Sequence, residues 1–195
     1  MAAGFKYNLT PELEMEEICD VQTLHHKRGP YKLDTTGLAI GSTLPRFTPV
    51  AVDLKKRTAV VVKNVKVLED AAGTATTIKV AKNSLVTAGM TLGTGTKGAK
   101  IASIDKTHAD YDVITVAAAF GEAVKAGQVL FEASADGGTK PKNVANFVIY
   151  ETTKVEEGIV LVAVIMQAFE IQESKLTLPF SDADKEALTA RFQFE

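Results

Sequence analysis

The sequence has 195 residues, of which 46% are hydrophobic and 24% are charged, and its formal net charge is -2. A chain of this length can bury roughly 70% of its unfolded surface, so the composition is that of a folded protein and excludes wholesale disorder. The balanced charge excludes the basic surface with which proteins bind nucleic acid, so we expect no nucleic-acid partner.

The compartment follows from the cysteine content and from hydrophobic runs. Cys19 is the only cysteine, so no internal disulfide can form. The first residues, MAAGFKYNLTPELE, lack the basic and apolar regions of a signal peptide. The longest apolar run, Ile159 to Met166, is far shorter than the roughly 20 residues of a membrane-spanning helix. We therefore expect folding in a reducing cytoplasm and no membrane partner.

Residues 1–52 show no sustained hydrophobic period and hold four of the six prolines, Pro11, Pro30, Pro45 and Pro49. Prolines at such spacing interrupt helices and strands, which predicts an irregular N-terminal arm over residues 1–52. A short helix is expected to begin at Thr10-Pro11 and to end near Ile18, because threonine caps helices and proline suits the first helical position.

From Thr58 the pattern changes to short β-branched runs separated by glycine, asparagine and aspartate. This pattern predicts a mainly β fold, as a small β-barrel or sandwich. The alternation breaks at Lys63-Asn64, which indicates a bulge or tight turn there. The expected strands are Thr58 to Leu68, Thr76 to Ala81, Ala99 to Ile104, Val113 to Val116 and Val129 to Glu132.

Two stretches resemble each other, TIKVAKNSLVTAGMTL and VITVAAAFGEAVKAGQVL. Val80 aligns with Val116 and Gly89 aligns with Gly127, and each copy reads as a strand, a loop, an Ala-Gly turn and a second strand. Glycine at the turn suits a positive φ or a close backbone approach. The alignment predicts a barrel-like domain with two similar halves over residues 53–135.

The C-terminal third contains a linker, further strands and a helix. Ser134 to Asn146 is polar and glycine-rich, so residues 136–146 are expected to form a loop or linker before a C-terminal β segment at 147–195. The run Ile159 to Met166 indicates a strand buried on both faces or at a subunit interface. Ser181 is expected to cap a short helix that turns Leu188 inward, followed by an edge strand at Phe192 to Phe194.

Gly93, Gly95 and Gly98 form a G-x-G-x-x-G pattern, the spacing that lets a backbone approach a pyrophosphate. The run that follows is β-like, so no helix N-terminus is available to bind phosphate, and we interpret the glycines as a hairpin loop.

Asp105, His108, Asp110 and Asp112 form the densest cluster of oxygen and nitrogen ligands. They could hold Ca²⁺, but the spacing is not that of an EF-hand, and such residues between two strands more often stabilise the turn. The turn interpretation is preferred, with a metal-dependent enzyme as the remaining alternative.

Two further groups are weighed and set aside. His25 and His26, followed by Lys27 and Arg28, have no cysteine or carboxylate at ligand spacing, so a solvated loop is expected. Cys19 lies in an acidic stretch that disfavours a thiolate, so it is expected to be a small apolar residue. No nucleophile elbow is present. The sequence thus yields no catalytic, cofactor-binding or metal residue, and we expect no enzyme.

Three stretches carry a resemblance to a known family: KRTAVVVKNVKV, IKVAKNSLVTAGMTLGTGTKGAKIASIDKTHADYDVITV and FEIQESKLTLPFSDADKEALTARFQF. Over roughly Leu44 to Glu195 the chain resembles the head fibre proteins of tailed phages and prophages. The resemblance implies a non-enzymatic virion protein that is made in the bacterial cytoplasm and decorates the outside of the capsid.

The same resemblance implies self-association, docking to the major capsid protein and a contact with the host surface. The apolar run Ile159 to Met166 independently favours a homo-oligomer, with a trimer preferred, because packing of identical chains would bury it. The arm at residues 1–52 is the expected docking segment. The alternative function is a β-module that binds a small molecule or glycan, which the absence of tryptophan disfavours.

Overall fold

The computed structural model describes residues 18–135 and 137–195, and its secondary structure is almost entirely β. The expected mainly β fold with a short C-terminal helix is confirmed, whereas the helix expected from Thr10 to Ile18 lies outside the described residues, apart from Ile18. In chain order the elements are β1 (Asp20–His26), β2 (Tyr31–Asp34), β3 (Thr43–Leu44), β4 (Pro49–Asp53), β5 (Thr58–Val61), β6 (Asn64–Lys66), β7 (Thr77–Ala81), β8 (Thr91–Gly93), β9 (Gly98–Asp105), β10 (Tyr111–Val116), β11 (Val129–Glu132), β12 (Phe147–Ile149), β13 (Thr153–Lys154), β14 (Leu161–Val162), β15 (Val164–Ile171), the 3-10 helices η1 (Glu173–Lys175) and η2 (Thr189–Arg191), α2 (Asp182–Leu188) and β16 (Phe192–Phe194).

The larger sheet has eight strands and curls back on itself. Its order is β1-β15-β12-β4-β5-β2-β14, with β16 paired to β15 beside this path. Only Ala163 separates β14 from β15, so one nearly continuous segment pairs with β2 at its start and with β12 just beyond. The sheet therefore wraps around one set of buried side chains. These are Tyr31, Leu33, Leu44, Val50, Val52, Ala59, Val61, Phe147, Ile149, Val155, Val160, Val162 and Val164.

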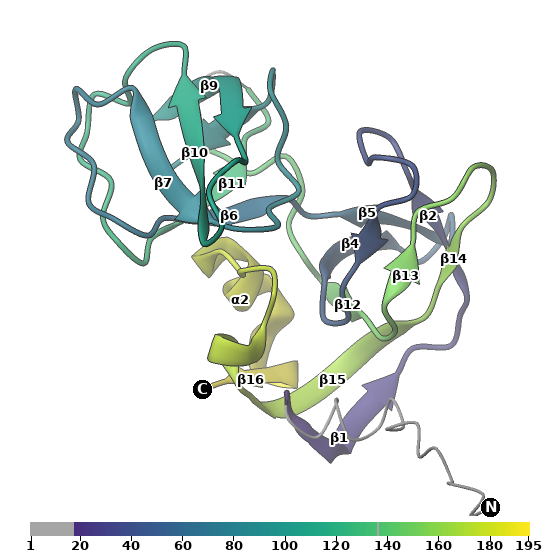
Figure 1. Ribbon diagram of the computed structural model, residues 1–195. Helices are drawn as coiled ribbons and strands as arrows, with labels where there is room; N and C mark the ends of the chain where they lie inside the picture. The colour runs from purple at the N-terminus through teal and green to yellow at the C-terminus, as the bar shows by residue number, and fades with distance from the viewer. Residues whose placement is uncertain (1–17, 136) are drawn as a thin grey trace, which may run out of the picture.

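Segments far apart in the sequence share this sheet, since β1 pairs with β15, β2 with β14 and β4 with β12 (Figure 1). The described part of the stretch expected to be an irregular arm, residues 18–52, does contain long loops, but it also supplies four strands. Leu33, Leu44 and Val50 from this stretch are buried in the core. Residues 31–52 therefore contribute to the core of the protein, and the long loops between their short strands agree with the irregular N-terminal part expected from the sequence.

The prolines of this stretch stand where a strand tolerates them. Pro30 precedes β2, Pro45 follows β3, and Pro49 is the first residue of β4. Proline lacks the N–H that a ladder needs, so it is confined to strand ends and edges. The interruptions that favoured an arm in the sequence are thus the boundaries of short strands.

The apolar run Ile159 to Met166 is not buried on both faces along its whole length. Ile159 and Leu161 are exposed, while Val160 and Val162 point into the core. This alternation has the period of two of a strand with one solvent-facing side. Consecutive burial begins only at Val164, where the C-terminal segment (residues 173–195) covers the outer face of β15.

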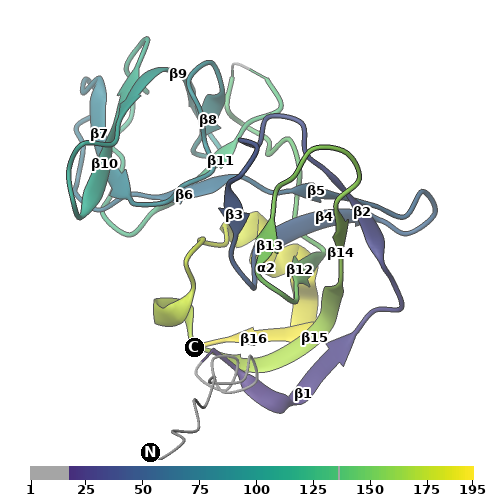
Figure 2. The same cartoon turned by 45° about the vertical axis from the view of Figure 1, so that its right-hand side comes forward.

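The second sheet has six strands in the order β6-β11-β8-β9-β10-β7, and it is also strongly curled. Its two outer strands meet at a β-bridge between Val67 and Val80, supported by a hydrogen bond from the Leu68 N–H to the Lys79 carbonyl at 3.0 Å. Figure 2 shows the resulting barrel-like body beside the eight-stranded sheet. Its core contains Val65, Val67, Ile78, Val80, Val86, Leu92, Ala99, Ile101, Ile114, Val116, Phe120, Val124 and Leu130.

The two similar stretches occupy matching places in this six-stranded sheet. The Gly89 N–H donates to the Ile101 carbonyl and the Ile101 N–H donates to the Met90 carbonyl, at 2.9 and 2.8 Å. The second copy repeats this pair, with Gly127 donating to Val67 at 2.8 Å and Val67 donating to Gln128 at 2.9 Å. Both glycines have positive φ, +89° and +85°. The turns therefore require glycine for their backbone conformation.

The chain crosses between the two sheets twice, at residues 62–64 and at residues 133–146. The break in alternation at Lys63-Asn64 is the first crossing, where β5 of one sheet ends and β6 of the other begins. The second crossing is the expected loop. It folds back on β11, because the Ser134 N–H donates to the Lys140 carbonyl and Ala133 bridges Pro141. The six-stranded sheet is thus inserted into the chain that forms the larger sheet.

The C-terminal segment packs against β15 and both crossings. Ser181 caps α2, its hydroxyl accepts the Asp184 N–H, and Leu188 is fully buried, so the expected helix is confirmed. The expected strand at Phe192 to Phe194 is β16, which pairs in parallel with β15. The rings of Phe180 and Phe194 pack in a tilted arrangement, with centroids 5.0 Å apart. This packing fixes α2 beneath the six-stranded sheet (Figure 1).

Candidate interaction surfaces

An exposed apolar strip lies on the outside of the eight-stranded sheet. Ile159 and Leu161 are 72% and 56% exposed, two residues apart on the same side of one strand segment. Leu161 pairs with Lys32 of β2, so a cation borders the strip. A shallow depression of about 320 Å³ lies alongside, lined by Lys32, Leu33, Asp34, Thr35, Thr58, Val60 and Gly158. Large apolar side chains that are neighbours on a surface are typical of a protein contact.

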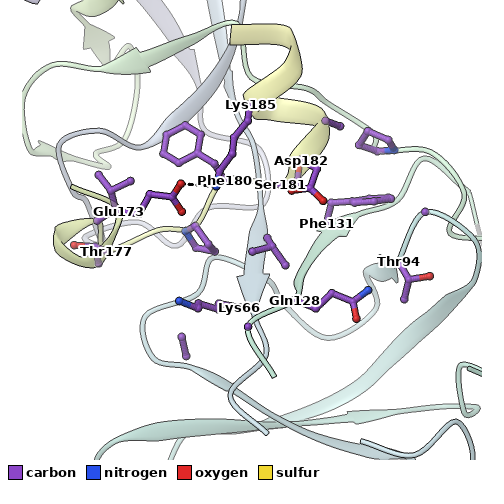
Figure 3. A pocket seen from close by; sticks show the side chains of 18 of the residues that line it. Lys66, Thr94, Gln128, Phe131, Glu173, Thr177, Phe180, Ser181, Asp182 and Lys185 are labelled. Atoms are coloured by element: carbon purple, nitrogen blue, oxygen red, sulfur yellow. Dashed lines mark hydrogen bonds and ion pairs between the residues drawn. The ribbon is translucent and has the colours of Figure 1, made fainter. Parts of the chain in front are cut away.

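A cleft of about 550 Å³ lies between the six-stranded sheet and the C-terminal segment. Figure 3 shows Lys66, Thr94, Gln128 and Phe131 on one wall, and Glu173, Thr177, Phe180 and Lys185 on the other. Phe131 and Phe180 are themselves buried, and Pro141 and Pro179 also line the cleft. Clefts at the junction of two packed units are common places for ligands to bind.

The charges in this cleft are balanced. Lys185 forms an ion pair with Glu173 on the same wall. Lys66 and Asp182 also line the cleft, and neither side chain has an ionic or hydrogen-bonding partner among residues 18–135 and 137–195. The cleft therefore presents one cation and one carboxylate in addition to a self-contained ion pair.

A smaller polar cavity of about 290 Å³ lies at the crossings. Glu132 stands between two lysines on adjacent segments, because its N–H donates to the Lys63 carbonyl and its carbonyl accepts the Lys142 N–H. The Lys142 ammonium is 2.8 Å from the Glu132 carboxylate, and the Lys63 ammonium donates to the Gly37 carbonyl at 3.1 Å. Burial lowers the pKa of Lys63 below its ordinary value, although the charge of Glu132 opposes this. These contacts hold the crossings together.

The cluster Asp105 to Asp112 forms a turn and does not converge. The Asp105 carboxylate accepts the Thr107 N–H and hydroxyl, at 2.9 and 2.7 Å, and these bonds lower the pKa of Asp105. Asp112 is buried on β10, where it forms an ion pair with Lys82 at 2.8 Å. His108 stacks on Tyr111. In the described part of the chain, no three histidine, cysteine or acidic side chains are grouped to hold a metal ion.

The glycines at 93, 95 and 98 form a hairpin, as expected. Gly93 pairs with Gly98 where β8 and β9 meet, and residues 94–97 make the loop between them. Glu122 closes the loop by accepting the hydroxyl protons of Thr94 and Thr96, and these bonds lower the pKa of Glu122. A carboxylate in this position is unsuited to a phosphate.

The histidine pair and Cys19 have structural surroundings. His25 and His26 lie in β1 and not in a loop, which corrects the expectation, and His26 packs on Tyr150 with ring centroids 4.1 Å apart. The sequence of β1 lacks the alternation of apolar and polar residues that marks a strand, because the register of its pairing with β15 shifts. Cys19 is buried, as expected, and burial together with the charge of Asp20 raises the pKa of its thiol to about 11. Its sulfur is protonated near neutral pH.

A family model described as "Head fiber protein" of phages matches residues 1–193. The chain belongs to the phage head fibre protein family. The match extends the resemblance from Leu44 back to the first residue. No curated protein and no solved structure matches the chain.

As a member of the head fibre family, the chain is a bacteriophage structural protein associated with the virion. A structural protein of the virion acts by contacts through its surface, and the exposed strip and the cleft are surfaces suited to such contacts. No helix among the described residues is long and apolar enough to cross a membrane.

Sequence reasoning found the strip, as part of an apolar run, but it missed the cleft. Lys66, Gln128 and Thr177 come from distant parts of the chain and become neighbours only when the two crossings are formed. No local pattern of residues marks them in the sequence.

Proposed function

We propose that this head fibre protein is a non-enzymatic decoration protein on the outside of the phage capsid, where it self-associates and docks to the major capsid protein. The observation that carries the self-association is the exposed apolar strip of Ile159 and Leu161. A homotrimer is the preferred assembly, because a closed symmetric interface would remove the strip from water in every copy.

The surroundings of the reactive side chains support a structural role. The Cys19 thiol is buried and has a raised pKa, Asp112 is neutralised by Lys82, and Asp105 stabilises its own turn. Each group serves the fold, which is the pattern expected of a protein that works through its surface.

Light scattering after size exclusion tests the self-association. We expect a mass of three times the 20.8 kDa chain for the unaltered protein, and a monomer for the double variant Ile159→Lys, Leu161→Lys, because burying two charges opposes assembly. The matched control is Leu68→Lys, a 41% exposed leucine on the six-stranded sheet, which should leave the mass unchanged. A monomeric unaltered protein at tens of micromolar would contradict self-association.

Co-sedimentation with preformed capsids of the phage tests the docking. The docking segment predicted at residues 1–52 cannot be removed whole, because residues 31–52 supply buried core side chains. Deletion of residues 2–17 leaves every described residue in place. Loss of co-sedimentation with an unchanged mass would assign docking to residues 2–17, and retained binding would assign it to the described body. A full chain that never sediments with capsids would overturn the decoration role.

A contact with the host surface belongs to the same proposal. Copies displayed together on one capsid raise the effective concentration of each weak site, so modest single contacts give firm attachment.

A further inference from the structure

We propose that neighbouring copies of the chain join through their exposed apolar strips, with the Lys32 ammonium of one copy against the Glu151 carboxylate of the next. This rests on the proposed self-association, and it names the residues that orient one copy on another. The strip has a cationic side and an acidic side, and only a second copy offers the complement of both.

The exposed apolar strip has a different neighbour on each side. The Leu33 N–H donates to the Val160 carbonyl at 2.8 Å, and the Tyr150 N–H donates to the Ala163 carbonyl at 3.0 Å. Carbonyl groups alternate sides along an extended chain, so two acceptors three residues apart point in opposite directions. Strand β2 therefore borders the strip on one side, and the segment that follows β12 borders it on the other.

The side formed by β2 is cationic. Lys32 is the direct partner of Leu161 in the ladder, and its N–H donates to the Arg57 carbonyl at 2.9 Å, which brings Arg57 beside it. Both cationic residues are exposed, and neither forms an ion pair with a residue that the structure describes. The Asp34 carboxylate, further along β2, accepts the Thr36 N–H of its own turn at 3.0 Å. One carboxylate against two cations leaves this side with a net positive charge.

The opposite side is acidic. Glu151 directly follows Tyr150, which is bonded to the segment of the strip, so Glu151 stands at the other border. Residues 151–157 lead from there to the start of the strip, and they hold two further carboxylates, Glu156 and Glu157, against one cation, Lys154. The three glutamates are exposed, and none has an ion-pair partner within residues 18–135 and 137–195.

Identical chains can satisfy both sides at once. When the cationic side of one copy lies against the acidic side of the next, the apolar strips are covered and the pair of opposite charges repeats around the symmetry axis. The reverse placement, with Lys32 against Lys32, would oppose like charges. The charges beside the strip therefore select a second copy as its occupant, in the orientation that brings Lys32 to Glu151.

Charge reversal tests the pairing. Lys32→Glu sets two carboxylates against each other, and Glu151→Lys sets two ammonium groups against each other, so each variant should weaken assembly. Exposed ion pairs contribute little each, so we expect about a fivefold loss for each contact, and about a hundredfold rise in the dissociation constant of a trimer with three contacts. Sedimentation equilibrium of the full chain over a dilution series measures these constants.

The double variant Lys32→Glu, Glu151→Lys restores opposite charges in exchanged positions. Its dissociation constant should return to within about threefold of that of the unaltered protein, because the pair is the same in either direction. The matched controls are Lys100→Glu on β9 and Asp110→Lys in the loop before β10, which make the same charge changes at exposed positions of the six-stranded sheet. Both controls should assemble as the unaltered chain does.

Salt gives a second readout. Raising NaCl from about 0.05 M to about 0.5 M screens exposed charges. It should weaken assembly of the unaltered protein, in which the two charges attract, and strengthen assembly of each single variant, in which they repel. A purely structural effect of either substitution would not reverse the sign of the salt response.

Two outcomes overturn the proposal. Single variants that assemble with the affinity of the unaltered chain would show that the two charges do not meet. A double variant that stays as weakly assembled as the single ones, with an unchanged melting temperature, would show that Lys32 and Glu151 have different partners. In both cases the unaltered chain still forms an oligomer, whereas a monomeric unaltered chain would contradict self-association itself.

Discussion

At the scale of single residues, one carboxylate joins three separate parts of the chain. Asp184 is fully buried and accepts from the Asn64 side chain and the Ala145 N–H, each at 2.7 Å. It also accepts from the Ser181 N–H and hydroxyl, at 3.0 and 2.6 Å. Asn64 and Ala145 belong to the two crossings between the sheets. One helix residue thus fixes both connections of the inserted sheet.

Asp184→Asn should therefore destabilise the protein. The amide replaces an accepting oxygen with a donor and leaves buried N–H groups unpaired, at a cost of about 1–3 kcal/mol. Urea unfolding measures the loss. Asp182→Asn is the matched control, because it removes the same charge from an exposed position in the same helix turn, and it should lose less than about 1 kcal/mol. Equal losses for the two variants would show that the bonds to the crossings contribute nothing.

At the scale of elements, the six-stranded sheet is held by a repeated turn. Gly89 and Gly127 adopt the same left-handed backbone and make the same pair of hydrogen bonds to Ile101 and Val67. No heavy atom lies within 4 Å of a Cβ built at either glycine. The requirement for glycine is thus purely conformational, and it is the same in both halves of the sheet.

Gly89→Val and Gly127→Val should each lower the free energy of unfolding by about 1–3 kcal/mol, because a β-branched residue is strained at positive φ. Thermal melting measures both. Gly137→Val is the control, since a Cβ there also meets no atom within 4 Å and its φ lies outside the left-handed region. If both test variants melted at the temperature of the unaltered protein, the two aligned turns would not require glycine, and the repeat would have no structural significance.

The sequence allowed elements to be predicted where their signals are local. Ser181 with Asp184 three residues later is a helix-capping signal, and the two Ala-Gly turns mark strand ends. The helix and the turns were therefore found at the positions predicted from these residues. Sheet membership was not predictable, because the pairing of β4 with β12 joins Val50 to Phe147 across a whole inserted sheet. The cleft depends on the same long-range pairing, so no local sequence pattern identifies the residues that line it.

At the scale of the whole molecule, the two sheets have separate cores. Every side chain of the six-stranded core lies between Val65 and Leu130. The core of the eight-stranded sheet combines residues on both sides of that interval. Contact between the two is made by Leu85, which packs against the larger core, and by the crossings. The inserted sheet therefore contains a complete hydrophobic core and can fold alone. Neither of the two segments that form the larger sheet contains a complete core by itself.

A fragment spanning residues 62–134 should fold independently, with dispersed amide resonances and a cooperative thermal transition. A fragment spanning residues 147–195 should remain unfolded, because it lacks β1, which pairs with β15, and β4, which pairs with β12. Circular dichroism and NMR compare the two. An unfolded 62–134 fragment would mean that Leu85 and the bonds to Asp184 are required to form the smaller sheet.

The insertion also has a meaning for how such a protein can change over generations. Asn64 lies directly opposite Phe131, so the incoming and outgoing strands of the inserted sheet are neighbours. Recombination that replaced the coding region between these two strands would exchange the whole six-stranded sheet. The strand pairing of the larger sheet, formed by residues 18–61 and 147–195, would be unchanged. A phage lineage could thereby exchange the inserted sheet as one unit and keep the strands that build the larger sheet.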